Sequence, residues 1–238
     1  MEQAQQLGDH LLKQTDPPVD VVYSSPFYRC IQTLAPFTAA RAAKAKETGA
    51  KETVNLEPGL GEFYGLARFD HPQPATLKVL EMHFPHLAAE KDPIIVPSTK
   101  GESIPQLHDR IAYCLQKLIH KLDNDPSQPR SLLICTHAAS MICIGRALTG
   151  NMPEDEGAED FRCFTCALSK FTRKNAATNG DSVPDKMNTD PTSTLWDPEN
   201  ADEVPDVNWR NGRGVAGGWT CEVNGDCSFL TNGEERGW

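Results

Sequence analysis

Two strand–turn–helix segments constrain what this chain can fold into. Residues 20–33 read Asp-Val-Val-Tyr-Ser-Ser-Pro-Phe-Tyr-Arg-Cys-Ile-Gln-Thr, and residues 132–140 read Leu-Leu-Ile-Cys-Thr-His-Ala-Ala-Ser. In each segment, a run of strand-forming residues leads through a turn into a helical pattern. Strands that alternate with helices form parallel sheets covered by those helices. The chain therefore predicts an α/β domain with a mainly parallel sheet.

The composition fits one such domain with an additional tail. The chain has 238 residues, of which 39% are hydrophobic, and this is enough to fill a core of that size. Its net charge of −10 argues against sequence-independent nucleic-acid binding by the whole surface, but it is compatible with a local basic pocket. No apolar run approaches the roughly 18 residues of a membrane span, so we expect no membrane partner.

The eight cysteines lie mostly inside apolar runs, as buried free thiols do. No signal peptide precedes the first helical pattern, so we expect a reducing compartment, cytoplasmic or nuclear. Cys163 and Cys166 form a C-x-x-C pair, but no second pair lies at zinc spacing. We therefore expect ordinary packed thiols.

Periodicity and turn residues place the other elements. Residues 104–122 show the clearest helical face, with Ser103 and Gln106 arranged as a capping box. Residues 63–100 contain several prolines and no clear period, which indicates an insertion packed over a site. The apolar run at 131–136 is typical of a strand buried on both faces. The pattern predicts helices over 2–14, 25–44, 104–122 and 138–148, and strands over 19–24, 54–56, 131–136 and 162–171.

The composition changes near residue 174. Residues 175–212 are rich in Asn, Asp, Pro, Thr and Gly, which is typical of a flexible acidic linker. Residues 213–238 recover aromatic and aliphatic side chains and contain Asn-Gly turns, which predict a small β tail. We therefore expect a domain over 1–174, a linker over 175–212 and a tail over 213–238.

Two residues at strand ends are candidates for anion binding. Arg29 lies in the opening turn of a helix, where backbone N–H groups favour a phosphate and the guanidinium adds a matching fork. His137 ends the second strand and is followed by small residues that let a ligand approach the backbone. An Arg paired with an acid on its own helix, and a structural His, are the alternatives.

Both segments resemble the second and fourth signature motifs of the histidine phosphatase (phosphoglycerate-mutase-like) superfamily. The resemblance covers most of residues 2–172. It implies a three-layer α/β/α fold and hydrolysis of a phosphomonoester, in a small molecule or a phosphoprotein, through a phosphohistidine. It also implies that Arg29 and His137 bind the phosphoryl group, and that neither a metal nor an organic cofactor is needed.

A third residue follows from the same resemblance. Family members carry a Glu in a stretch similar to Leu60-Gly61-Glu62-Phe63, and there it protonates the leaving oxygen. Glu62 is therefore the expected general acid, with a pKa raised by burial. Glu57 is the competing assignment, and a solvated loop carboxylate is the structural alternative.

The family's first motif, an Arg-His-Gly that carries the nucleophilic His, does not occur in these 238 residues. In the family this motif ends a central strand beside the one that ends at His137. Without that strand, unpaired backbone groups would each cost about 1–3 kcal/mol when buried, which soon exceeds a typical stability margin. We therefore expect an incomplete sequence, missing the first strand and inactive as written.

The C-terminal residues suggest a second kind of protein. Residues 218–238 include Ser-Phe-Leu-x-x-Gly-Glu-Glu-Arg-x-Trp and resemble a small β segment of transcription factor IIIC, a general factor of RNA polymerase III. One subunit of that factor carries a histidine-phosphatase-like domain. The alternative function is therefore a non-catalytic subunit that binds other subunits through 213–238. A hairpin that docks on its own domain through Trp219, Phe229 and Trp238 explains the same residues.

Overall fold

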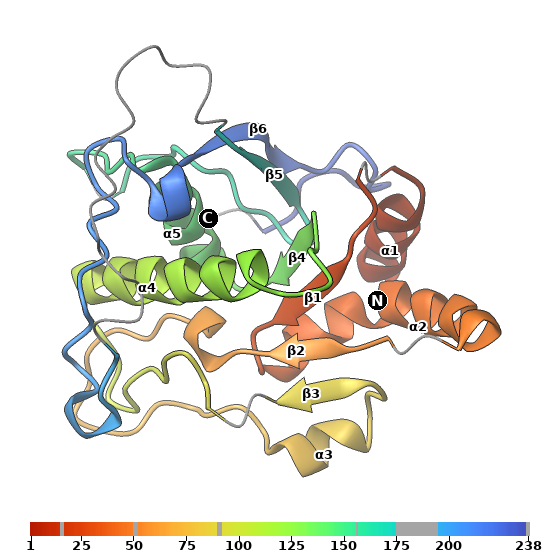
Figure 1. Ribbon diagram of the computed structural model, residues 1–238, viewed down its shortest axis with the longest axis horizontal. Helices are drawn as coiled ribbons and strands as arrows, with labels where there is room; N and C mark the ends of the chain where they lie inside the picture. The colour runs from red at the N-terminus through yellow and green to blue at the C-terminus, as the bar shows by residue number, and fades with distance from the viewer. Residues whose placement is uncertain (15–16, 50–51, 90–91, 156, 175–194, 237–238) are drawn as a thin grey trace.

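The fold was analysed in a computed structural model of the 238-residue chain (Figure 1). The structure describes all residues except 15–16, 50–51, 90–91, 156, 175–194 and 237–238. The chain forms an α/β fold, with a four-stranded parallel sheet and a separate two-stranded antiparallel sheet.

The parallel sheet is built around the first strand. β1 (Val21–Ser24) pairs with β2 (Val54–Leu56) on one side and with β4 (Leu132–Cys135) on the other. β3 (Leu87–Ala89) extends the sheet beyond β2, which gives the order β3-β2-β1-β4. β3 and the short helix α3 (Leu77–Glu81) lie in the predicted insertion, which therefore contributes regular structure to the domain.

Long helices cover both faces of this sheet. Tyr23 and Ile134 point to the face that packs against α4 and α5, whereas Val22 and Leu133 point to the face that packs against α1 and α2. This alternation is the period of two that a strand imposes on its side chains. The helices are α1 (Glu2–Gln14), α2 (Tyr28–Thr48), α4 (Ile104–Asp123) and α5 (Ala138–Thr149).

Two helix boundaries illustrate where the sequence pattern succeeds and fails. The predicted capping box of α4 is present, because the Ser103 side chain accepts the Gln106 N–H and the Gln106 side chain accepts the Ser103 N–H. The start predicted for α2 at residue 25 is wrong, since Phe27 is its N-cap. The Ser25 hydroxyl lies 2.8 Å from His137 Nε2 and also accepts the N–H of Phe27, the N-cap residue, at 3.4 Å.

The prediction that residues 131–136 form a fully buried strand is also wrong. β4 forms the edge of the parallel sheet, and all of its residues are partly exposed. The last predicted strand, 162–171, is observed as β5 (Leu168–Arg173) and pairs antiparallel with β6 (Trp219–Asp226) in the second sheet. Apolarity alone did not distinguish an edge strand from a central one, because strand partners distant in sequence decide that difference.

The predicted linker is partly packed structure. Its residues 175–194 lie outside the described part of the chain. From Leu195 onward, the segment runs along α4 and α5: the Trp196 N–H donates to the Tyr113 hydroxyl at 2.9 Å, and Trp209 is 1% exposed and stacked on His108. Residues 195–212 are therefore not flexible throughout, because Trp196 and Trp209 in this acidic segment contact α4.

The tail packs on the domain that precedes it. β6 pairs with β5, and the Phe229 ring stacks on His10 of α1 with centroids 4.2 Å apart. Trp219 packs against the core formed with α4 and α5, and Trp238 lies outside the described residues. The self-docking alternative therefore describes Trp219 and Phe229. The division into three domains stays a prediction.

Trp209→Ala should lower the free energy of unfolding by about 3–5 kcal/mol, because it removes a large buried side chain. Leu195→Ala in the same segment is the control, since Leu195 is 75% exposed and its loss should cost less than about 0.5 kcal/mol. Urea unfolding of the two variants measures the difference. Equal stability of both would show that residues 195–212 do not belong to the folded unit.

Candidate functional site

The parallel pairing of β1 and β4 brings their carboxyl ends together. The Ser25 N–H donates to the Cys135 carbonyl at 2.9 Å, which continues the strand register by one residue. The Ser25 hydroxyl then lies 2.8 Å from Nε2 of His137, and both side chains are buried. This contact fixes the His137 ring at the N-terminus of α5, where His137 is the N-cap residue.

Arg29 reaches this ring from the first turn of α2. Its Nε lies 3.1 Å from His137 Nδ1, and its Nη2 lies 2.7 Å from Glu62 Oε2. The side chain is 53% exposed, and its guanidinium lies 5.0 Å from the centroid of the Phe27 ring. The structure thus brings the three predicted residues together, and Arg29 does not pair with an acid on its own helix.

The Glu57 carboxylate holds one side of the loop that carries Glu62. The Glu57 side chain is fully buried, and its carboxylate accepts N–H groups from Gly59 at 2.8 Å and from Ile94 at 3.1 Å. This carboxylate caps the short helix η1 (Pro58–Leu60) and ties it to the insertion. Its position is structural, which favours Glu62 over Glu57 as the carboxylate of the site.

Further bonds hold the same loop from above. Arg110 of α4 donates to the Gly59 carbonyl at 2.6 Å and pairs with the buried carboxylate of Glu102. Thr136 donates to the Leu60 carbonyl at 2.6 Å, and Ser140 donates to the Gly61 carbonyl at 2.7 Å. The loop is therefore a preorganised support, and Glu62 extends from its end.

The charges in the site are strongly linked. Burial lowers the pKa of His137, but hydrogen bonds and charges from Cys30 and Glu62 outweigh burial and raise the pKa above 6.5. Burial raises the pKa of Glu62, but His137, the Phe63 N–H and Arg29 outweigh it and lower the pKa below 4.5. The expectation of a raised Glu62 pKa therefore does not hold for the unliganded site.

His137 Nδ1 lies 3.1 Å from both Arg29 Nε and Glu62 Oε2, so it cannot accept from one and donate to the other at once. The contacts with Cys30 and Glu62 raise the pKa of His137, whereas the Arg29 Nε–H can donate to Nδ1 only when Nδ1 carries no proton. Glu62 lies between the Arg29 guanidinium and the His137 ring.

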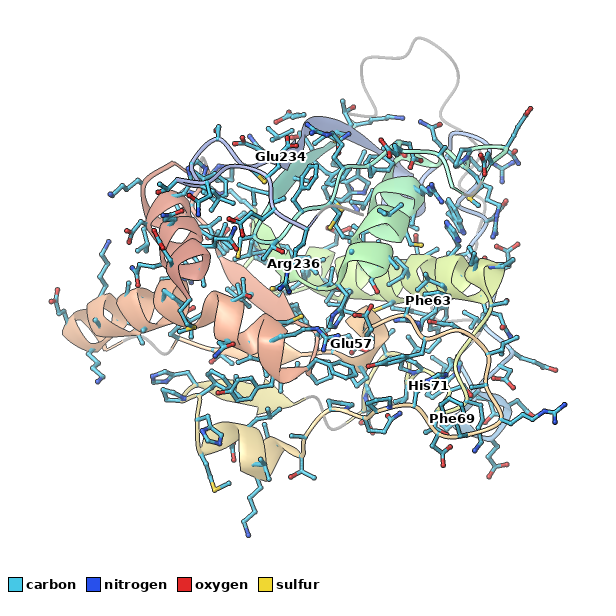
Figure 2. All side chains as sticks on the ribbon, turned by 180° about the vertical axis from the view of Figure 1, so that it is seen from behind. Glu57, Phe63, Phe69, His71, Glu234 and Arg236 are labelled. Carbon is cyan, nitrogen blue, oxygen red and sulfur yellow. The ribbon has the colours of Figure 1, made fainter. Side chains whose placement is uncertain are left out.

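Aromatic rings extend from the site along the loop after Glu62. Phe27 meets the His137 ring edge-on, with centroids 5.3 Å apart, and lies 6.3 Å from Tyr64. The Tyr64 ring stacks on the His71 ring, with centroids 4.7 Å apart. The Phe69 ring meets the His71 ring edge-on, with centroids 5.4 Å apart (Figure 2). The insertion thus supplies an apolar surface beside the charged groups.

Sequence reasoning missed Cys30 as a member of the site. Its Sγ lies 3.6 Å from His137 Nε2, and a hydrogen bond from Cys135, together with His137 and Arg29, overcomes burial and lowers its pKa to about 5. The available signal was its position directly after Arg29 in a helix's first turn, where a thiolate is stabilised.

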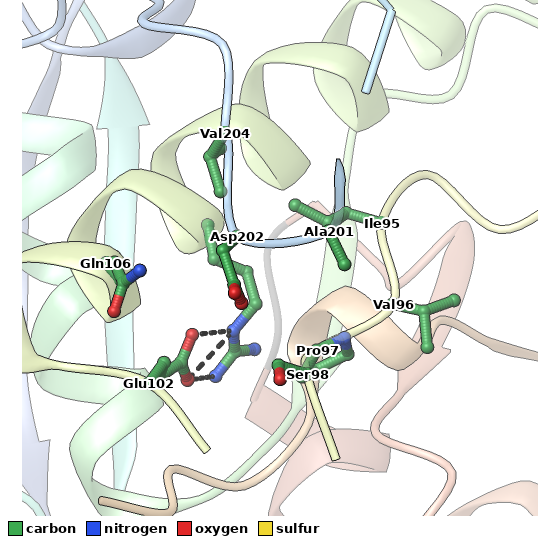
Figure 3. Close-up of a pocket in the computed structure, with 10 residues that line it drawn as sticks. Ile95, Val96, Pro97, Ser98, Glu102, Gln106, Ala201, Asp202 and Val204 are labelled. Carbon is green, nitrogen blue, oxygen red and sulfur yellow. Dashed lines mark hydrogen bonds and ion pairs between the residues drawn. The ribbon is translucent and has the colours of Figure 1, made fainter. Parts of the chain in front are cut away.

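A small pocket lies apart from the candidate site, between residues 95–106 and 201–204 (Figure 3). Its walls include the buried pair of Arg110 and Glu102, and it contains none of the predicted site residues. Within the described ranges, no group of three His, Cys, Asp or Glu residues is arranged to hold a metal ion. The helices that the structure describes are all too short or too polar to cross a membrane.

Comparisons with known proteins assign the family. The model of the histidine phosphatase superfamily (branch 1) matches residues 1–185. The chain therefore belongs to the histidine phosphatase superfamily, as its motifs predicted.

Curated relatives differ in what they are described as doing. The chain is 28% identical over 245 aligned residues to the transcription factor tau 55 kDa subunit of Saccharomyces cerevisiae, covering 100% of this chain and 49% of that protein. It is 27% identical over 155 residues to the ecdysteroid-phosphate phosphatase of Drosophila melanogaster, covering 63% of this chain and 19% of that protein. The chain thus spans about half or less of the length of either relative.

A solved structure is also similar to this chain. The ecdysone phosphate phosphatase of Bombix mori, in complex with tungstate, matches with a TM-score of 0.48 and 17% identity, covering 67% of this chain and 58% of that one.

Glu62→Gln should lower the pKa of His137, because it removes a negative charge and a strong hydrogen-bond acceptor from Nδ1. NMR titration of the His137 ring measures this, and wild type should titrate above 6.5. Glu222→Gln is the matched control, since Glu222 pairs with Lys170 on the second sheet. An unchanged His137 pKa in Glu62→Gln would contradict the linkage.

Proposed function

We propose that this chain is a subunit of a transcription factor IIIC-type assembly, in which its histidine-phosphatase fold binds a phosphoryl group without hydrolysing it. The observation that carries the proposal is the match to the tau 55 kDa subunit over the whole chain, including the residues beyond the family model at 185. The partners would be other subunits of that assembly, and the protein would act in the nucleus.

The packing of the tail supports a single functional body. β6 pairs with β5, and the buried Trp209 stacks on His108 of α4, which supports treating the residues after 194 and the proposed anion site as one body. Subunit binding would therefore use exposed surface of this body. Loss of Trp219 would disturb the fold itself, because Trp219 packs against the core.

The site supports phosphate binding through its charges. Arg29 offers a half-exposed guanidinium, and His137 offers an imidazole ring with a raised pKa beside the N-terminus of α5. Glu62 occupies their shared partner position and would yield to a phosphoryl group. The ligand would be a phosphorylated small molecule or a phosphoprotein.

Phosphomonoester hydrolysis is the second candidate, favoured by the placement of Arg29, His137 and Glu62 around one point. The reaction needs a nucleophile, and the family supplies it from an Arg-His-Gly that these 238 residues do not contain. We infer that the chain as given binds phosphate without turnover.

Arg29→Ala should weaken the binding of inorganic phosphate by about 10- to 100-fold, because a charge-assisted hydrogen bond contributes about 1.5–3 kcal/mol. Arg173→Ala is the control, since Arg173 is an exposed arginine paired with Asp123. Isothermal titration calorimetry measures both.

Two outcomes of this experiment would contradict the proposal. Equal phosphate affinity of both variants would remove Arg29 from the site. Turnover of p-nitrophenyl phosphate by the wild-type chain, lost in Arg29→Ala, would show that a complete active site is present.

The assembly is tested by affinity purification of the tagged chain from its native cells. Subunits of transcription factor IIIC should copurify, and they should do so equally with Arg29→Ala, because the anion site is separate from subunit binding. Absence of those subunits from a purification that recovers soluble, folded chain would contradict the assembly role and leave the phosphate site to be judged by calorimetry.

A further inference from the structure

Two cysteines meet at the base of the candidate site. Cys30 lies in the first turn of α2, and Cys135 is the last residue of β4. The Cys135 Sγ lies 3.5 Å from the Cys30 carbonyl oxygen, and the Cys30 Sγ lies 3.5 Å from the carbonyl oxygen of Thr136, the residue after Cys135. The two residues are distant in sequence, but they are neighbours because α2 packs on the face of the sheet that includes Cys135.

Cys30 differs chemically from the other thiols of the chain. Its sulfur faces the His137 ring at 3.6 Å from Nε2 and 3.9 Å from Nδ1, beside the guanidinium of Arg29. The pKa of Cys30 is lowered to about 5, so its thiol is ionised at neutral pH. Burial raises the pKa of Cys143, which is equally hidden, to about 12. The thiolate is the reactive form of cysteine.

We propose that Cys30 and Cys135 form an oxidisable pair, in which Cys30 reacts with a hydroperoxide and Cys135 converts the product to a disulfide. Cys30 is only 3% exposed, and this restricts the oxidant to a small molecule such as hydrogen peroxide. Cys135 is partly exposed, so a small oxidant can reach the pair from its side.

The reaction balances with hydrogen peroxide as the only oxidant. The Cys30 thiolate attacks one peroxide oxygen, so that an S–O bond forms, the O–O bond breaks and hydroxide leaves. That hydroxide takes the Cys135 proton and becomes water, and the Cys135 thiolate attacks the Cys30 sulfur. The S–S bond forms, the S–O bond breaks and a second hydroxide leaves. The two sulfurs lose two electrons in total, and the peroxide gains them.

Oxidation would also act on the anion site, and this consequence rests on the proposed phosphate-binding function. The Cys30 thiolate is one of the groups that raise the pKa of His137. A disulfide carries no charge, so oxidation would favour the neutral imidazole and weaken the hold on an anion. The pair would then make phosphate binding dependent on redox conditions.

The test is peroxide treatment of the reduced, purified full-length chain, followed by alkylation of free thiols and peptide mass spectrometry. The expected product is a Cys30–Cys135 disulfide, formed at least about tenfold faster than oxidation of Cys143, because the larger thiolate fraction of Cys30 outweighs the lower nucleophilicity of a low-pKa thiolate. Cys143→Ser is the matched control and should form the same disulfide at the same rate. In Cys135→Ser, dimedone should trap a sulfenic acid at Cys30.

Three results would overturn the proposal. In the first, Cys30 remains fully alkylatable while other cysteines oxidise. In the second, Cys30 forms a disulfide with a cysteine other than Cys135. In the third, Cys30 is oxidised irreversibly while Cys135 remains a free thiol. The readout needs no phosphate. A disulfide that forms without changing phosphate affinity would leave the oxidisable pair in place and remove only its link to the anion site.

Discussion

The parallel pairing of β1 with β4 is the constraint on which the rest of the structure depends. It sets Ser24 opposite Cys135, and one residue further on it places Ser25 against His137. Each strand then enters a helix whose N-terminus faces the same point. The N-termini of α2 and α5, with their partial positive charges, therefore lie close to Arg29 and His137. The strand register thus places the residues of the proposed anion site next to one another.

The loop after β2 adds the negative charge that balances these groups. It is anchored by the Glu57 carboxylate on one side and by Arg110 on the other, so Glu62 is presented from a rigid support. The Glu62 carboxylate thus offsets the positive charge of Arg29 within the site. Under the proposed function, phosphate binding would compete with Glu62, and phosphate recognition and the protonation of Glu62 would be linked.

The sequence predicted those features that local pattern decides. The capping box of α4 follows from residues within one turn. Arg29 and His137 were predicted from two short motifs, and Glu62 from the resemblance of its stretch to the family. The sequence mispredicted β4 as a buried strand, because the burial of a strand depends on partners far along the chain. The Glu62 pKa was also misjudged, since burial was visible in the pattern but the adjoining His137 and Arg29 were not. Cys30 was overlooked because its reactivity arises only where α2 meets β4.

The central claim is that Arg29 and His137 form a phosphoryl-binding site from which Glu62 must withdraw. A crystal structure of the chain grown with inorganic phosphate tests it most directly. We expect a phosphate oxygen within hydrogen-bond distance of both Arg29 and His137, with the Glu62 carboxylate no longer bonded to Arg29 Nη2. A phosphate bound elsewhere, or an unchanged Arg29–Glu62 pair at saturating phosphate, would contradict it.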